Sequence, residues 1–358
     1  MQPEDVSTLI EKGIALFELG KYEESLIYFD RAISVQPGDL SVLYNKGFAL
    51  RNLGRYEEAI MYFDKVLSME PDNVITLIEK GVALDLLDRY EEAIGYYSKV
   101  LAIEPDNFGA LNNIGWALDR LGRYEKALIY FDKAISVQPL DIKPLGNKGT
   151  SLRNLGRYEE AIIYYDKVLA IDPNNISALD NKAQSLTDLR RYEEALVCVD
   201  RILSIKPDDP ESLQNKGVIL GCWGRFSESI TYFDRVISIQ PDNAVALTLK
   251  GNALLYLERF GAAVSAFDKA LDIDPGDTAA LYYKGLALAR LGRYEESITY
   301  FDRVISINSN HLNALNDKGA SLAMLGRYKE AISYFDRVLA IDPNDVVALR
   351  NKAIFMEQ

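Results

Sequence analysis

The apolar residues of this chain form two helical stripes that recur every 34 residues. Counted from Val6, position 4 is Leu in all eleven successive segments, and position 11 is Leu in the ten complete segments. Together with Gly or Ala at position 8, these leucines lie on one face at the period of an α-helix. Positions 20, 21, 24, 27, 28 and 30 form a second such face. Each segment therefore predicts two successive helices.

The residues at the segment boundaries indicate where these helices begin and end. Position 34, just before the first helix, is Asp or Asn from Asp5 to Asp345 except at His311, and such side chains can accept hydrogen bonds from the first free amides. Position 15 is Gly in seven of ten segments, which favours a left-handed residue after the first helix. Nine of the twelve prolines stand at position 32 and end the second helix, while Pro144 and Pro210 fall in a first turn.

The unbroken register of these helix-turn-helix units predicts one elongated domain over residues 1–358. A period of this length indicates stacked supersecondary units, because a single hairpin would leave one face of each helix uncovered. The ten complete repeats are 6–39, 40–73, 74–107, 108–141, 142–175, 176–209, 210–243, 244–277, 278–311 and 312–345, and a partial eleventh covers 346–358.

Both ends of the chain have the sequence of incomplete repeats. Met1 to Asp5 match the last residues of a repeat, with Pro3 lying 34 residues before Pro37. The chain stops inside an eleventh first helix, which leaves Ile354, Phe355 and Met356 without a second helix to pack on. Terminal units of a solenoid normally carry a polar outer face. We therefore expect the chain to be a piece of a longer array.

The second repeat carries Gly47, Tyr56, Ala59, Phe63 and Pro71 at the small, aromatic and proline positions of the tetratricopeptide repeat, which it resembles. The resemblance extends over nearly the whole chain, and ten copies in register make it specific. It implies an all-α fold in which helical hairpins stack as a right-handed superhelical solenoid.

One column departs from the family, which usually has an apolar residue at position 7. Here position 7 is Lys in ten of eleven copies, with Ile114 as the exception. A column of lysines could bind anions along its length. We expect instead that each aliphatic stem lies along its hairpin while the ammonium reaches water or the Asp column at position 25.

Charge and composition exclude several classes of partner. With 53 acidic and 40 basic side chains, the net charge of −13 repels the phosphate backbone of nucleic acids. No apolar run is long enough to cross a membrane, and the amino end lacks the basic and apolar regions of a signal peptide. We therefore expect a cytoplasmic protein that binds neither nucleic acid nor a membrane.

The sequence offers no constellation for catalysis, metal binding or a cofactor. Cys198 and Cys222 match no disulfide or zinc pattern and are expected to be free thiols. His311, the only histidine, stands in a capping column. Cys222 has no histidine or basic neighbour that could activate it as a nucleophile. We predict that the chain is not an enzyme and needs no cofactor.

The resemblance implies that the first helix of each repeat lines a concave inner surface through positions 2, 5, 6, 9, 12 and 13. Related arrays hold extended peptides with a ladder of asparagines, whose amides can donate to and accept from a peptide backbone. The alternative is an asparagine typical of the family that contacts no ligand. At position 6 this chain has Asn45, then Asn113, Asn147, Asn181 and Asn215 in four consecutive repeats.

The remaining lining residues divide into zones of different chemistry. Repeats 1 to 3 are mainly apolar, and the middle repeats offer polar residues such as Arg153 and Asn154. Repeats 8 and 9 combine leucines with Tyr256, Tyr282 and Tyr283. An apolar stripe flanked by polar groups favours an interaction surface. We therefore predict a non-catalytic scaffold whose groove binds an extended segment of a partner protein. The alternatives are a structural solenoid that forms homo-oligomers through its open ends, and the targeting arm of a larger enzyme.

Overall fold

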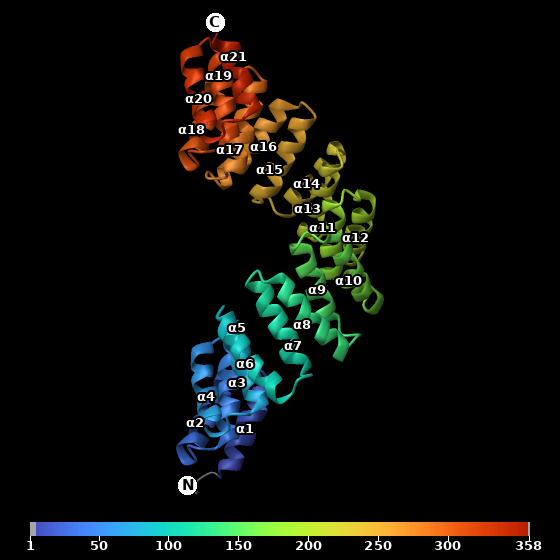
Figure 1. Cartoon of the computed structure of the whole chain (residues 1–358), viewed down its shortest axis with the longest axis vertical. Helices are drawn as coiled ribbons and strands as arrows, with labels where there is room; N and C mark the ends of the chain where they lie inside the picture. The colour runs from blue at the N-terminus through green and yellow to red at the C-terminus, as the bar shows by residue number, and fades with distance from the viewer. Residues whose placement is uncertain (1–4, 357–358) are drawn as a thin grey trace. The chain divides into compact units, whose positions relative to one another are not determined.

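The computed structural model describes residues 5–356, which form 21 helices and no strand. The all-α prediction is therefore confirmed, and each repeat is a hairpin of two helices (Figure 1). The first helices are α1 Val6–Glu18, α3 Leu40–Asn52, α5 Val74–Asp85, α7 Phe108–Arg120, α9 Ile142–Asn154, α11 Ile176–Asp188, α13 Pro210–Cys222, α15 Ala244–Tyr256, α17 Thr278–Arg290, α19 Leu312–Met324 and α21 Val346–Met356. The second helices are α2 Tyr22–Val35, α4 Tyr56–Met69, α6 Tyr90–Ile103, α8 Tyr124–Val137, α10 Tyr158–Ile171, α12 Tyr192–Ile205, α14 Phe226–Ile239, α16 Phe260–Ile273, α18 Tyr294–Ile307 and α20 Tyr328–Ile341.

The contacts within the chain divide it into two compact units, Met1–Ser185 and Leu186–Gln358. Within each unit the helices pack in chain order, as α1 does on α2 and α17 does on α18. A helix also packs on the first helix of the next repeat, as α2 does on α3. Each unit is thus a solenoid with its own core, and a single domain over residues 1–358 stays a prediction.

Glycine at position 8 allows the two helices of a hairpin to interdigitate. A Cβ atom added to Gly115 would lie 2.6 Å from Cε1 of Phe131, the aromatic residue at position 24. Nine of the ten complete repeats pair Gly with an aromatic residue in this way, and the other pairs Ala183 with Val199. Leucines at positions 4 and 11, such as Leu145 and Leu152, are buried beside these contacts. The predicted stripes are therefore the two sides of the core.

The predicted caps form at nearly every first helix. Asp39, for example, accepts a hydrogen bond from the Val42 amide at 3.0 Å. His311 also caps its helix, because its Nδ1 accepts from the Ala314 amide at 3.2 Å. Asp5 makes no such bond, so the capping prediction is wrong there.

Left-handed residues end the first helices as predicted. The seven glycines at position 15 have φ between 71° and 82°. Asp88, Arg190 and Glu258 occupy the same place in other repeats with φ of 57°, 60° and 55°. The hairpin therefore keeps its turn geometry even where the side chain opposes it.

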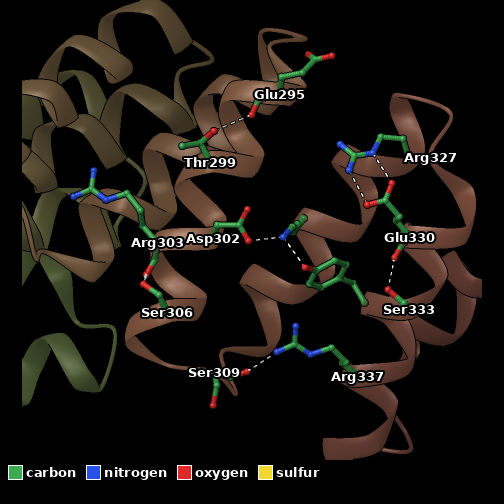
Figure 2. A network of polar contacts seen from close by, with 12 residues as sticks. Glu295, Thr299, Asp302, Arg303, Ser306, Ser309, Arg327, Glu330, Ser333 and Arg337 are labelled. Atoms are coloured by element: carbon green, nitrogen blue, oxygen red, sulfur yellow. Dashed lines mark hydrogen bonds and ion pairs between the residues drawn. The ribbon is translucent and has the colours of Figure 1, made fainter.

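The lysines at position 7 join neighbouring repeats. Lys318 donates to Asp302 of the preceding repeat and to the hydroxyl of Tyr334 at 2.6 Å, and Figure 2 shows this network around Asp302. The expectation that the ammonium groups reach the Asp column is confirmed. The one repeat without this lysine also lacks its partner. Ile114 stands at position 7 of the fourth repeat, and Ser98 replaces Asp at position 25 of the third. The paired residues are Lys46–Asp30, Lys80–Asp64, Lys148–Asp132, Lys182–Asp166, Lys216–Asp200, Lys250–Asp234, Lys284–Asp268, Lys318–Asp302 and Lys352–Asp336.

The terminal predictions have different outcomes. The likeness of Met1 to Glu4 to the end of a repeat lies outside the described residues. In α21, Phe355 stacks against Tyr328 and Phe335, whereas Ile354 and Met356 are exposed.

Candidate interaction surface

The first unit brings two of the predicted ladder asparagines together. The Asn147 amide donates to Oδ1 of Asn112 at 3.3 Å, and the Asn112 amide donates to Oδ1 of Asn113 at 3.4 Å. Asn45 lies apart from this cluster, because position 6 of the intervening repeat is Glu79. Its amide donates to the Ser41 carbonyl of its own helix at 2.9 Å. The row of asparagines is therefore interrupted after the second repeat.

The other predicted polar residues are partly engaged within the protein. The amide of Asn181 donates to the Ser177 carbonyl at 2.9 Å. Arg153 donates to the Gln184 side chain of the next repeat, which holds its guanidinium along the surface, and Asn154 is exposed at the end of α9. Asn215 is half-buried on α13 in the second unit.

The first unit also contains buried acids that the sequence analysis did not single out. Arg51 and Glu79 form an ion pair at 2.5 Å with both side chains largely covered. Asp85 is only 7% exposed, and it accepts a hydrogen bond from the Tyr97 hydroxyl at 2.6 Å. Burial raises the pKa of Asp85 to about 7. The signal was Tyr97, which stands at position 24 where most repeats have Phe.

In the second unit, Tyr282 and Tyr283 meet edge to face with ring centroids 5.2 Å apart. The hydroxyl of Tyr282 donates to Asp317 at 2.8 Å. Burial raises the pKa of Asp317, and the bond from Tyr282 opposes this shift. The Tyr282 hydroxyl is therefore engaged within the protein, whereas Tyr283 lines a cavity.

Tyr256 is the most exposed of the predicted aromatic residues, at 66%. Its ring stacks in parallel on Phe226 with centroids 4.6 Å apart, which fixes it as an exposed wall at the end of α15. Cavities of about 430 and 280 Å³ lie on its two sides. The first cavity is bounded by α13, α14 and α15, and the second by α15, Phe260 of α16 and α17.

Three residues at these cavities escaped the sequence analysis. Gly221 and Asn252 line the first cavity, and Asn252 also lines the second together with Arg290. The signal for Gly221 was the lack of a side chain at position 12, where neighbouring repeats have Thr187 and Leu255. Glycine has no side chain, so its residue type alone gives no chemical sign of a lining position.

The comparison with protein families covers nearly the whole chain. Family models of the tetratricopeptide repeat match residues 6–39, 41–73, 74–139, 142–175, 184–252, 248–311 and 312–345. The chain belongs to the tetratricopeptide-repeat family. The hairpins and the repeated spacing of their glycine, aromatic and proline positions are thus those of tetratricopeptide repeats.

Solved structures share this fold at low sequence identity. A tetratricopeptide repeat protein from Parabacteroides merdae is 20% identical with a TM-score of 0.57, and the match covers 70% of this chain and 98% of that one. MamA from Desulfovibrio magneticus is 27% identical with a TM-score of 0.45, covering 48% and 98%. Yeast Tom70 is 16% identical with a TM-score of 0.46, covering 98% and 95%. None of the curated proteins compared with the chain matches it.

Two further features of the described residues bear on function. None of the helices in residues 5–356 is long and apolar enough to cross a bilayer. Over the same residues, His, Cys, Asp and Glu side chains form no group of three suited to holding a metal ion. Both cysteines are free thiols, with Cys198 buried and Cys222 exposed at the first cavity.

Proposed function

We propose that this tetratricopeptide-repeat chain is a non-catalytic scaffold that binds an extended segment of a partner protein on the surface lined by its first helices. The observation that carries the proposal is the pair of cavities on the two sides of Tyr256. Exposed aromatic walls beside apolar cavities are typical of surfaces that take side chains of a partner.

The difference between the constant core positions and the variable lining positions of the repeats also supports this function. Core positions repeat with little change, whereas position 6 varies from Asn113 to Leu249, Tyr283 and Asp317. Packing explains the constancy of the core, but it does not require this variation on the lining. The Asn112, Asn113 and Asn147 cluster could donate to and accept from a peptide backbone at the first unit.

A peptide library displayed on phage and selected against the full chain tests the proposal. We expect enrichment of related sequences and saturable binding of the corresponding synthetic peptides in fluorescence anisotropy. For peptides that bind the first unit, Asn147→Ala combined with Asn181→Ala should weaken binding while circular dichroism stays unchanged. A selection that enriches no peptide would contradict the proposed function.

Self-assembly is a second candidate, favoured by the apolar surface of α21. Val346, Ile354 and Met356 are exposed there and could be covered by a second copy. Light scattering over a hundredfold dilution series distinguishes the candidates, because assembly predicts a molar mass that falls on dilution. A constant monomer mass would exclude self-assembly.

A further inference from the structure

The first cavity exists because position 12 of the seventh repeat is Gly221. A Cβ atom added there would have Ser229 Oγ, 3.5 Å away, as its nearest neighbour, which is an ordinary contact. Ser229 Oγ already donates to the Gly217 carbonyl at 2.7 Å, so this polar wall atom is satisfied. The cavity is therefore open because residue 221 has no side chain to fill it. Its other walls are mainly apolar and are formed by Val218, Phe226, Phe233, Leu249, Ala253 and Tyr256.

The second cavity continues the first across Tyr256. Both cavities share Tyr256 and Asn252, so one aromatic ring and one amide separate them. Leu255, Phe260, Tyr283 and Leu286 supply apolar walls, and Glu258 and Arg290 are its charged residues. A mainly apolar cavity thus adjoins a second cavity whose lining is apolar and polar in about equal parts.

Several polar side chains at these cavities have no hydrogen-bonding partner among residues 5–356, and they include Asn252, Glu258 and Arg290. The Asn252 amide accepts and donates no hydrogen bond, and the Arg290 guanidinium forms no hydrogen bond or ion pair. The carboxylate of Asp317 attracts Arg290 electrostatically, but it is occupied by the hydroxyl of Tyr282. Both groups are therefore available to a ligand.

We propose that these cavities bind an extended peptide with two apolar side chains separated by one residue and a carboxylate next to the second of them. Alternate side chains of an extended chain lie on the same side about 7 Å apart, which suits two cavities separated by one ring. The Asn252 amide would pair with the backbone between them, and Arg290 would bind the carboxylate through paired N–H groups. This assignment deepens the proposed function and rests on it.

The planar guanidinium of Arg290 sets the preference for an acid. Glu258, in the turn after α15, and Arg290, the last residue of α17, are both exposed at the second cavity. A carboxylate can bind the Arg290 guanidinium through two parallel N–H groups, whereas an ammonium group has no such paired geometry to offer Glu258. We therefore expect the selected peptides to be acidic at this place.

The displayed library and the full chain test this assignment through its sequence pattern. We expect enrichment of peptides with two apolar residues separated by one residue, followed or preceded by Asp, Glu or the free carboxyl terminus. Gly221→Leu should fill the first cavity and lower the affinity of such a peptide by at least about tenfold. Arg290→Gln should lower it by about three- to tenfold and abolish the preference for an acid.

The blocking variant has a matched control, because Gly95 lies on the exposed face of α6 with nothing within 4 Å of an added Cβ. Both Gly221→Leu and Gly95→Leu should keep the helical circular dichroism and the Tm at or above those of the parent chain, since leucine favours helix over glycine. Only the first should lose the peptide.

The outcomes separate this assignment from the general function. If no peptide is enriched, both fail. If peptides are enriched but keep their affinity in Gly221→Leu, or lose it only in the Asn147→Ala and Asn181→Ala variant, the scaffold function stands and this assignment is overturned. Enrichment of basic peptides, or of peptides with one apolar residue, would also overturn it.

Discussion

The lysine at position 7 shows how one charged side chain can join two repeats. In the pair formed by Lys148 and Asp132, the lysine side chain is 10% exposed and the aspartate side chain is 58% exposed. Burial alone would lower the pKa of Lys148, but its bonds to Asp132 and Tyr164 outweigh burial and raise the pKa. Loss of the carboxylate should therefore cost more stability than loss of the lysine, because the covered ammonium would be left unpaired whereas the exposed carboxylate would stay hydrated.

This asymmetry predicts the outcome of a double-mutant cycle. Asp132→Ser should destabilise the chain by about 1 to 3 kcal/mol, because the buried ammonium keeps only the Tyr164 hydroxyl. Adding Lys148→Ile should recover most of this loss, since Ser98 and Ile114 are the chain's own version of the exchanged pair. Urea unfolding of the four proteins measures the coupling. A double variant no more stable than Asp132→Ser would contradict the coupling.

The carboxyl group of Asp85 predicts a pH dependence. Burial raises its pKa from 3.8 to about 7, so the folded chain holds this proton more tightly than the unfolded chain. The contribution of Asp85 to the free energy of unfolding therefore falls as the pH rises between these values, and the loss is complete above the folded pKa.

Asp85→Asn should remove this dependence, because the asparagine carbonyl can still accept from Tyr97. Its stability advantage over the parent chain should grow by more than about 1 kcal/mol between pH 5 and pH 8. Thermal unfolding across this range measures the difference, with Asp72→Asn at an exposed turn as the control. If this advantage does not change with pH, Asp85 does not gain or lose a proton in the folded chain over this range, and the prediction is wrong.

At the scale of the elements, the close approach of the two helices depends on position 8. Gly115→Ala should destabilise the chain by about 1 to 3 kcal/mol, because the new methyl group would lie 2.6 Å from Phe131. Gly95→Ala, with open space around the new methyl group, should stabilise it by about 0.5 to 1 kcal/mol. Thermal unfolding compares the two. Equal effects would mean that the hairpin can widen at little cost.

The helices were predictable because several local signals agree at each boundary. Position 34 caps the first helix, position 15 ends it, and proline at position 32 follows the second. The columns that face the surface were also predictable from the period. The sequence does not indicate which side chains in those columns stay free. Tyr282 and Tyr256 have the same residue type, yet one donates to Asp317 and the other is exposed on Phe226.

The first cavity was not predicted because it depends on relations between repeats. Gly221 leaves the space, Phe226 of the same repeat supports one wall, and Tyr256 of the next repeat closes it. Periodicity gives each residue a column, but a cavity requires the combined volumes of several columns. The cavity therefore became visible only with the side chains in place.

At the scale of the whole molecule, stability is expected to be local to each stretch of neighbouring repeats. Packed helices are neighbours one or two apart in the chain, as α8 is to α9 and α7 is to α9. Leu152→Ala should cost about 2 to 5 kcal/mol, since Leu152 is buried against Ala161 and Tyr165. Hydrogen exchange should show the loss of protection in α9 and α10 and none in α20. Uniform loss along the chain would contradict local stability.

The pairing of Lys with Asp across each repeat boundary affects how such a gene could gain or lose repeats by recombination. Removing the seventh repeat would place Asp200 opposite Lys250, so the ion pair at the new junction would be restored. Removing the fourth would place Ser98 opposite Lys148, which would leave a covered ammonium without a carboxylate. Most whole-repeat deletions are therefore compatible with the junction chemistry, whereas Ser98 and Ile114 have to be inherited or lost together.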